Sequence, residues 1–155
     1  MVRVMASGVF DILHTGHISY LEQAKALGDE LYVVVASDNT VRKNKHEPIT
    51  PERMRVRIVS ALKPVDVAMI GNDSGDMFAI LDEIRPDVIV LGFDQKFNEN
   101  VLSEELKKRG FDIAVKRLCP LLDKLHVLVQ LVQLQVSYSE LVFLVCQFLI
   151  NGSQL

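Results

Sequence analysis

Short apolar runs alternate along the chain with segments whose apolar positions recur at helical spacing. β-Branched and other apolar residues fill five runs, at residues 2–7, 31–37, 67–70, 88–91 and 113–115. Short apolar runs of this kind are typical of strands buried on both faces of a parallel sheet. We therefore expect five buried parallel strands.

The segments of helical period lie between these runs, at residues 18–27, 51–62, 77–84 and 99–109. A glycine or a proline follows each segment closely, as is usual where helices end. The alternation of strand and helix predicts an α/β fold with a doubly wound, mostly parallel, five-stranded sheet of Rossmann-like type. Ligands bind such sheets beyond the carboxyl ends of the strands where the winding reverses, so the loops after the first, second and fourth strands are the places expected to carry function.

The composition changes abruptly near Leu118. Only three charged residues, Asp123, Lys124 and Glu140, occur from there to the end, and five of the seven glutamines lie there among leucines and valines. The longest uninterrupted apolar run of this part, residues 141–146, is far shorter than the roughly 18–20 residues that a membrane span needs. We expect a domain at residues 1–118 followed by an atypical apolar tail at residues 119–155.

Charge and cysteine content narrow the possible environments and partners. A net charge of -3 argues against a general nucleic-acid binder, so any anion site must be local. Cys119 and Cys146 are far apart and lack metal-binding spacing, which suits a reducing cytoplasm. The N-terminus has a short β-like run and no signal-peptide pattern. These features predict a cytoplasmic protein with no nucleic-acid or membrane partner.

The densest chemistry follows the first strand, where Gly8 opens a turn and His14-Thr15-Gly16-His17 begins a helix. The two histidines are three residues apart, so they can face one side of the helix start. The N-terminus of a helix attracts phosphate, Thr15 or a neighbour can cap it, and Gly16 leaves room for a phosphate to approach the backbone. A lone histidine is usually structural, but two histidines and two glycines at one point favour a phosphate site.

A basic group follows the second strand, at a second place where the fold predicts ligand. Arg42, Lys43 and Lys45 form it in an otherwise acidic chain. We expect Lys43 and Lys45 to meet phosphate, with Lys43 among the catalytic residues, although a solvated loop with ordinary lysines is the plain alternative. No P-loop, dinucleotide fingerprint or Ser/His/Asp hydrolase pattern is visible in the sequence.

The motif Gly8-x-Phe10-Asp11 followed by His14-x-Gly16-His17 resembles the signature of the cytidylyltransferase-like nucleotidyltransferases. That superfamily includes glycerol-3-phosphate cytidylyltransferase, pantetheine-phosphate adenylyltransferase and the archaeal-type FAD synthase. The stretches at residues 42–45, 51–55, 61–66 and 91–95 are most similar to the archaeal FAD synthase branch, which joins AMP to FMN. The resemblance runs from about residue 2 to residue 118.

The resemblance implies roles for individual residues. His14 and His17 would contact the triphosphate and the transition state, and the Val9 and Phe10 backbone would line the nucleotide pocket. Asp11 would orient the loop or help to hold a divalent cation. The remaining nucleotide-binding residues are expected to be Thr15, Gly16, Lys45, Arg55 as the phosphate-contacting arginine, and Asp94 near the ribose or base, whereas Arg53 and Arg57 are expected to be surface charges.

Three functions stay open at this point. The first is transfer of AMP from ATP to FMN, and the second is a cytidylyltransferase that acts on glycerol 3-phosphate or a sugar phosphate; both need Mg²⁺ or Mn²⁺ with the triphosphate, and the resemblance implies a homodimer. The third is a catalytically impaired nucleotide-binding or assembly module.

The third possibility rests on the tail. Enzymes of this superfamily usually carry, near the C-terminus, an arginine and a Ser/Thr-rich helix start that reach the β- and γ-phosphates, and here Arg117 is the last arginine. We therefore hypothesise a reading-frame shift near Leu118. An adjacent frame of the coding DNA that encodes no Ser/Thr-rich, basic segment would contradict it.

Overall fold

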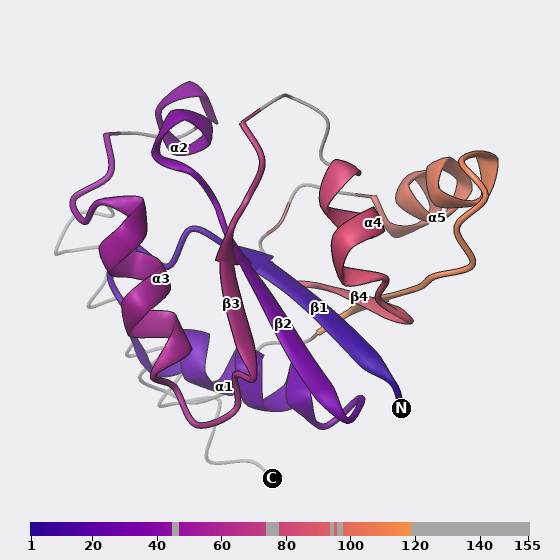
Figure 1. Cartoon of the computed structure of the whole chain (residues 1–155), viewed down its shortest axis with the longest axis horizontal. Coiled ribbons are helices and arrows are strands. Elements are labelled where there is room, and N and C mark those ends of the chain that lie inside the picture. Colours follow the sequence, from indigo (N-terminus) through magenta and orange to yellow (C-terminus); the bar gives the residue numbers. More distant parts are fainter. Residues whose placement is uncertain (45–46, 74–77, 94, 96–97, 119–155) are drawn as a thin grey trace, which may run out of the picture. The chain divides into compact units, whose positions relative to one another are not determined.

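A five-stranded, all-parallel sheet forms the centre of the computed structural model, which describes residues 1–44, 47–73, 78–93, 95 and 98–118. The strand order is β3-β2-β1-β4-β5, and Figure 1 shows the strands running side by side. The strands are β1 (Arg3–Gly8), β2 (Glu30–Val35), β3 (Val67–Ile70), β4 (Val88–Leu91) and β5 (Ala114–Arg117). This order, with the first strand in the centre, confirms the doubly wound sheet expected from the sequence.

Helices cover both faces of the sheet (Figure 1). Leu21 of one helix and Val59 of another pack on one face, and Ile84 and Leu106 pack on the other. The helices are α1 (Thr15–Lys25), α2 (Asp38–Asn44), α3 (Glu52–Ser60), α4 (Ala79–Ile84) and α5 (Glu99–Lys108). Helices α1, α3, α4 and α5 correspond to the four segments of helical period, and no end differs by more than three residues; α1 begins three residues before its expected segment.

Helix α2 was not expected from the sequence. Its seven residues include a single strongly apolar side chain, Val41, which is buried in the core. One apolar position cannot show a helical period, so the segment reads as a polar loop. Its start is marked by Ser37, whose hydroxyl oxygen accepts a hydrogen bond from the Thr40 N–H at 3.1 Å, as a helix-capping serine does.

The central strand separates from one neighbour before it separates from the other. β1 pairs with β2 as far as Gly8 opposite Val35, but with β4 only as far as Ala6 opposite Val90. The winding direction reverses between β1 and β4, and this is the point where a doubly wound sheet receives its ligand. We call it the switch point.

The described residues, which end at Leu118, belong to one compact unit. The expected tail at residues 119–155 lies outside the described residues. No helix in the described part of the chain combines the length and the apolarity that crossing a membrane requires.

Candidate functional site at the switch point

The turn after β1 is held in an unusual backbone conformation. Phe10 has φ of 52°, in the left-handed region that non-glycine residues seldom adopt, and its side chain is buried in the core. A Cβ on Gly8 would lie 2.7 Å from the Phe10 ring, so only glycine fits there. From the sequence, the Phe10 backbone is expected to line the nucleotide pocket. The structure adds that the buried Phe10 side chain anchors the turn after β1 in the core.

His14 is the N-cap of α1, a role that the sequence had offered to Thr15 or a neighbour. Its ring Nδ1 accepts a hydrogen bond from the Gly16 N–H at 3.1 Å. A neutral imidazole that accepts at Nδ1 carries its proton on Nε2, so His14 is set as a donor through Nε2. Thr15 is exposed at the first helical position, and no acidic residue occupies the first turn of α1 to neutralise its positive end.

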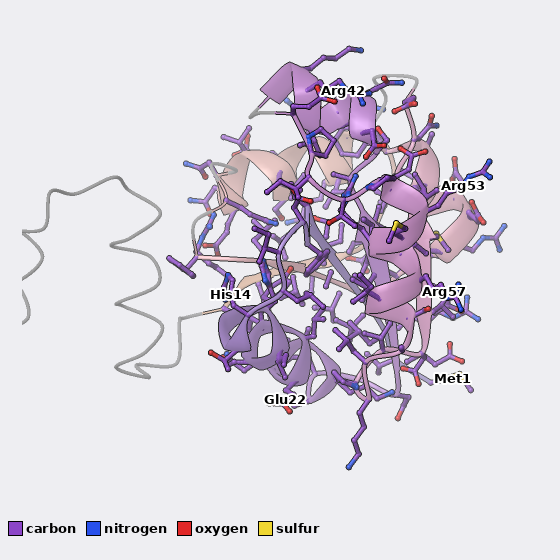
Figure 2. The ribbon with its side chains drawn as sticks, turned by 90° about the vertical axis from the view of Figure 1, so that its left-hand side faces the viewer. Met1, His14, Glu22, Arg42, Arg53 and Arg57 are labelled. Atoms are coloured by element: carbon purple, nitrogen blue, oxygen red, sulfur yellow. The ribbon has the colours of Figure 1, made fainter. Side chains whose placement is uncertain are left out.

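His17 lies against His14, as the three-residue spacing predicted. The two ring centroids are 4.0 Å apart, and the Phe10 ring packs against His17 at 5.3 Å. The Nδ1 atom of His17 is buried, which closes this nitrogen to a ligand. The structure therefore assembles two imidazoles, backed by Phe10, at the N-terminus of one helix. Figure 2 shows His14 at the start of α1.

Asp11 orients the loop, which is the first of the two roles expected for it. Its two carboxylate oxygens accept hydrogen bonds from the backbone N–H groups of Ile49, at 2.9 Å, and Thr50, at 2.8 Å. The Thr50 hydroxyl donates in return to the Asp11 carbonyl oxygen. Because these bonds join the β1 turn to the segment before α3, Asp11 acts as a structural tie in this conformation rather than as a cation ligand.

Arg55 corrects the sequence-based expectation of a phosphate contact. Its side chain is 0% exposed, and its guanidinium donates to the Thr50 carbonyl at 2.8 Å, the Val9 carbonyl at 2.7 Å and the Asp38 carboxylate at 2.6 Å. A phosphate cannot reach a group enclosed in this way. Arg55 instead fastens the β1 turn, α2 and α3 to one another, and the Val9 carbonyl that was expected to line the nucleotide pocket faces it.

The other two arginines of α3 behave as expected. Arg53 and Arg57 are exposed, and Figure 2 shows both side chains pointing outward from α3. The three arginines are two residues apart along one helix, so their different surroundings follow from which side of α3 faces the core.

The basic group after β2 is carried by α2. Lys43 is exposed in its last turn, and Arg42 donates from Nε to both carboxylate oxygens of Glu47, at 2.8 and 2.9 Å. Lys45 lies outside the described residues. Figure 2 shows Arg42 well apart from His14, on a separate element, so in this conformation α2 and the start of α1 form two distinct parts of the carboxyl edge of the sheet.

The Asp73 carboxylate, in the loop after β3, faces α2. Hydrogen bonds from the Ser37 hydroxyl and the Asn39 side-chain amide, with a smaller contribution from the charge of Lys43, hold the pKa of Asp73 below its usual value. Asp73 therefore stays ionised at neutral pH and ties the loop after β3 to α2. Among the described residues, no three His, Cys, Asp or Glu side chains gather closely enough to hold a metal ion.

Three residues at the switch point were given no role from the sequence. The Tyr20 hydroxyl donates to the Val90 carbonyl at 3.0 Å, and the Gln95 amide nitrogen donates to the Ser7 carbonyl at 2.8 Å. Arg117 donates to the carbonyls of Gly92 and Gln95. No sequence signal marks them, because a side chain that binds a backbone carbonyl needs no partner of a particular type. Asp94, expected near the ribose or base, lies outside the described residues.

Comparison with known protein families places this site in context. The model of the cytidylyltransferase-like family matches residues 5–145. The chain belongs to this family. The match includes the turn after β1 and both histidines, so the family membership and the geometry of the site concern the same residues.

Individual relatives narrow the comparison. Curated FAD synthases from Aciduliprofundum boonei and Archaeoglobus profundus are 55% and 57% identical over 118 residues, which cover 76% of this chain and 78% and 75% of those proteins. A solved structure described as the lipopolysaccharide core biosynthesis protein of Thermoplasma volcanium is 50% identical, with a TM-score of 0.76, and covers 78% of this chain and 98% of that one. The family member therefore shares half or more of its aligned residues with proteins that are given two different roles.

Proposed function

We propose that this family member is a nucleotidyltransferase that transfers AMP from ATP to FMN, forming FAD and pyrophosphate. The observation that carries the proposal is the pair His14 and His17, with ring centroids 4.0 Å apart at the N-terminus of α1. The names of the FAD synthases that share more than half of its aligned residues support the choice of ATP and FMN.

The reaction requires that the two substrates be positioned and that the developing charge be stabilised. It needs no covalent intermediate. A phosphate oxygen of FMN attacks the α-phosphorus of ATP, a P–O bond forms there, and the bond to the bridging oxygen of the β-phosphate breaks, so that pyrophosphate leaves with the electron pair. Negative charge grows on the α-phosphate oxygens and on the leaving group. The N-terminal end of α1 and the two Nε2 atoms would stabilise that charge.

The His14 ring is oriented in advance because its Nδ1 already accepts a hydrogen bond from the Gly16 N–H. A donor whose tautomer and orientation are fixed in advance costs no reorganisation during the reaction. We propose that Lys43, with Lys45, contacts a phosphate of one substrate, and that Thr15, Gly16 and Asp94 lie at the nucleotide.

We propose that ATP enters as its Mg²⁺ or Mn²⁺ complex. The triphosphate and water together supply most of the oxygen ligands in such complexes, so the protein needs no complete metal cage. This agrees with the engagement of both Asp11 carboxylate oxygens by backbone N–H groups.

A second candidate is a cytidylyltransferase acting on glycerol 3-phosphate or a sugar phosphate. This candidate rests on the description of the T. volcanium protein as one of lipopolysaccharide core biosynthesis, which names no acceptor. The same two histidines would serve CTP and ATP equally, because in the proposed role they contact phosphates and not the base.

A product assay separates the two candidates. The full chain is incubated with Mg²⁺ or Mn²⁺, with ATP or CTP, and with FMN, glycerol 3-phosphate or a panel of sugar phosphates, and the products are separated by chromatography. We expect FAD to form from ATP and FMN, and we expect no product from the other pairs of substrates. A CDP-linked product would establish the second candidate, and nucleotide binding without any product would establish the impaired nucleotide-binding module.

The setting of the reaction is also a proposal. We place the protein in the cytoplasm, without nucleic-acid or membrane partners, as a homodimer. Met54 and Ile58, one turn apart on α3 and exposed at 56% and 44%, offer an apolar contact for a second copy. We retain the reading-frame shift as the origin of the tail, with weaker triphosphate binding as its expected effect.

A further inference from the structure

An arginine holds the wall of the switch point on the β4 side. Arg117, the last residue of β5, donates from Nη1 to the Gly92 carbonyl at 2.8 Å and to the Gln95 carbonyl at 3.0 Å, and from Nε to the Glu99 carboxylate at 2.8 Å. Its side chain therefore joins β5, the start of α5 and the segment after β4. We call Gly92, Phe93 and Gln95, the described residues of that segment, the β4 loop.

The β4 loop reaches across the switch point to the central strand. The Gln95 side chain donates to the Ser7 carbonyl at 2.8 Å, and its amide oxygen accepts from the Gly92 N–H at 3.3 Å. Ser7 is the first residue of β1 beyond its pairing with β4. Gln95 thus bridges the two strands at the point where they separate, one residue before the turn that leads to the histidines.

These contacts connect Arg117 to the turn after β1 in two steps. Arg117 fixes the backbone of the β4 loop, and the loop fixes Gln95 against the end of β1. Charge-assisted hydrogen bonds from a planar guanidinium to two carbonyls constrain direction as well as distance, which lysine cannot reproduce. Arg117 therefore adds to the hydrogen bonds within the β4 loop and to Ser7 that hold the loop in one position.

We propose that Arg117 is a positioning residue for ATP: it holds the β4 loop, through Gln95, as the wall of the nucleotide site opposite His14 and His17. The inference rests on the proposed function for the identity of the nucleotide. Arg117 acts without touching the substrate, so its removal should weaken nucleotide binding more than it slows the chemical step.

The molecule offers a matched control at the opposite end of the sheet. Arg3 also pairs with a glutamate, Glu30, at 3.0 Å, and also donates to a backbone carbonyl, that of Ile84, at 3.2 Å. Its side chain is 39% exposed and that of Arg117 is 26% exposed. Arg3 lies at the amino end of β1, away from the switch point.

The experiment compares Arg117→Met with Arg3→Met in the full chain. We measure the Kd for ATP by calorimetry without FMN, the KM and kcat of FAD formation, and the melting temperature. For Arg117→Met we expect Kd and KM for ATP to rise about tenfold or more, the scale of a lost charge-assisted hydrogen bond, with kcat within about threefold. Arg3→Met should leave Kd, KM and kcat unchanged, and the Kd and KM of Arg117→Lys should fall between those of Arg117→Met and of the unsubstituted chain.

Equal ATP affinity in Arg117→Met and the unsubstituted chain, or equal losses in the Arg117 and Arg3 variants, would overturn the proposal. If Arg117→Met does not fold, Gln95→Met tests the same wall, and unchanged ATP affinity in that variant would equally overturn it. An unsubstituted chain that binds ATP but forms no FAD would count against the acceptor while leaving the affinity comparison valid. An unsubstituted chain that binds no ATP would overturn both the proposed function and the role of Arg117.

Discussion

Replacement of His17 by alanine is expected to reduce turnover by about 100-fold to 1000-fold while leaving the fold intact. That range is the measured cost of removing one donor from a charge-stabilising site in acyl transfer, and we apply it to phosphoryl transfer. The His17 ring is held against His14 and Phe10, so its position is fixed before substrate arrives. Steady-state kinetics with ATP and FMN, together with circular dichroism, measure the effect.

Two amide variants refine this prediction. Because Nδ1 of His17 is buried, the catalytic donor should be Nε2. A glutamine side chain places its amide nitrogen near the position of Nε2, and an asparagine places it near that of Nδ1. His17→Gln should therefore retain more activity than His17→Asn. Retention of more than about a tenth of the normal rate by His17→Ala would contradict the role assigned to the residue.

Replacement of Arg55 by methionine is expected to lower the free energy of unfolding by about 3 kcal/mol. Removal of one partner from a buried, hydrogen-bonded ion pair typically costs about 3–5 kcal/mol, and we take the lower end because the Asp38 side chain is 21% exposed. The carbonyls of Val9 and Thr50 would also lose their donors. Denaturant unfolding, monitored by circular dichroism, gives the value.

The same helix provides the control for Arg55. Arg53→Met and Arg57→Met remove equal charge from exposed positions and should change the free energy of unfolding by no more than about 0.5 kcal/mol. Arg55→Met could prove as stable as these two variants and yet bind ATP more weakly. That result would contradict the structural role of Arg55 and would support the phosphate contact expected from the sequence.

The inner strands of the sheet could be predicted from the sequence because they are largely buried, whereas the edge strands β3 and β5 are only partly covered. Strand β4 is Val-Ile-Val-Leu with every residue buried, and a short run of this composition is typical of an inner strand of a parallel sheet. The two-histidine motif was equally informative, since both imidazoles come from one short segment and local helical geometry alone brings them together. Helix α2 was missed because its single buried side chain, Val41, leaves no pattern to read.

The roles of the arginines could not be predicted, because they depend on partners distant in the chain. Arg55 is enclosed by groups from the β1 turn, α2 and the segment before α3, and Arg117 by the β4 loop and α5. An arginine that binds backbone carbonyls can have neighbours of any sequence, so no motif announces it. Family resemblance suggested a phosphate contact for Arg55, and only the burial of its side chain in the folded structure revealed a different one.

In the proposed reaction, AMP moves from the α-position of ATP to the phosphate of FMN. ATP carrying ³²P at the α-phosphate tests it directly when it is incubated with FMN, Mg²⁺ and the full chain. We predict that the label appears in FAD and that the pyrophosphate is unlabelled, and that ATP labelled at the γ-phosphate gives the reverse. Label at the α-phosphate that never enters FAD, while ATP is bound or consumed, would contradict the account.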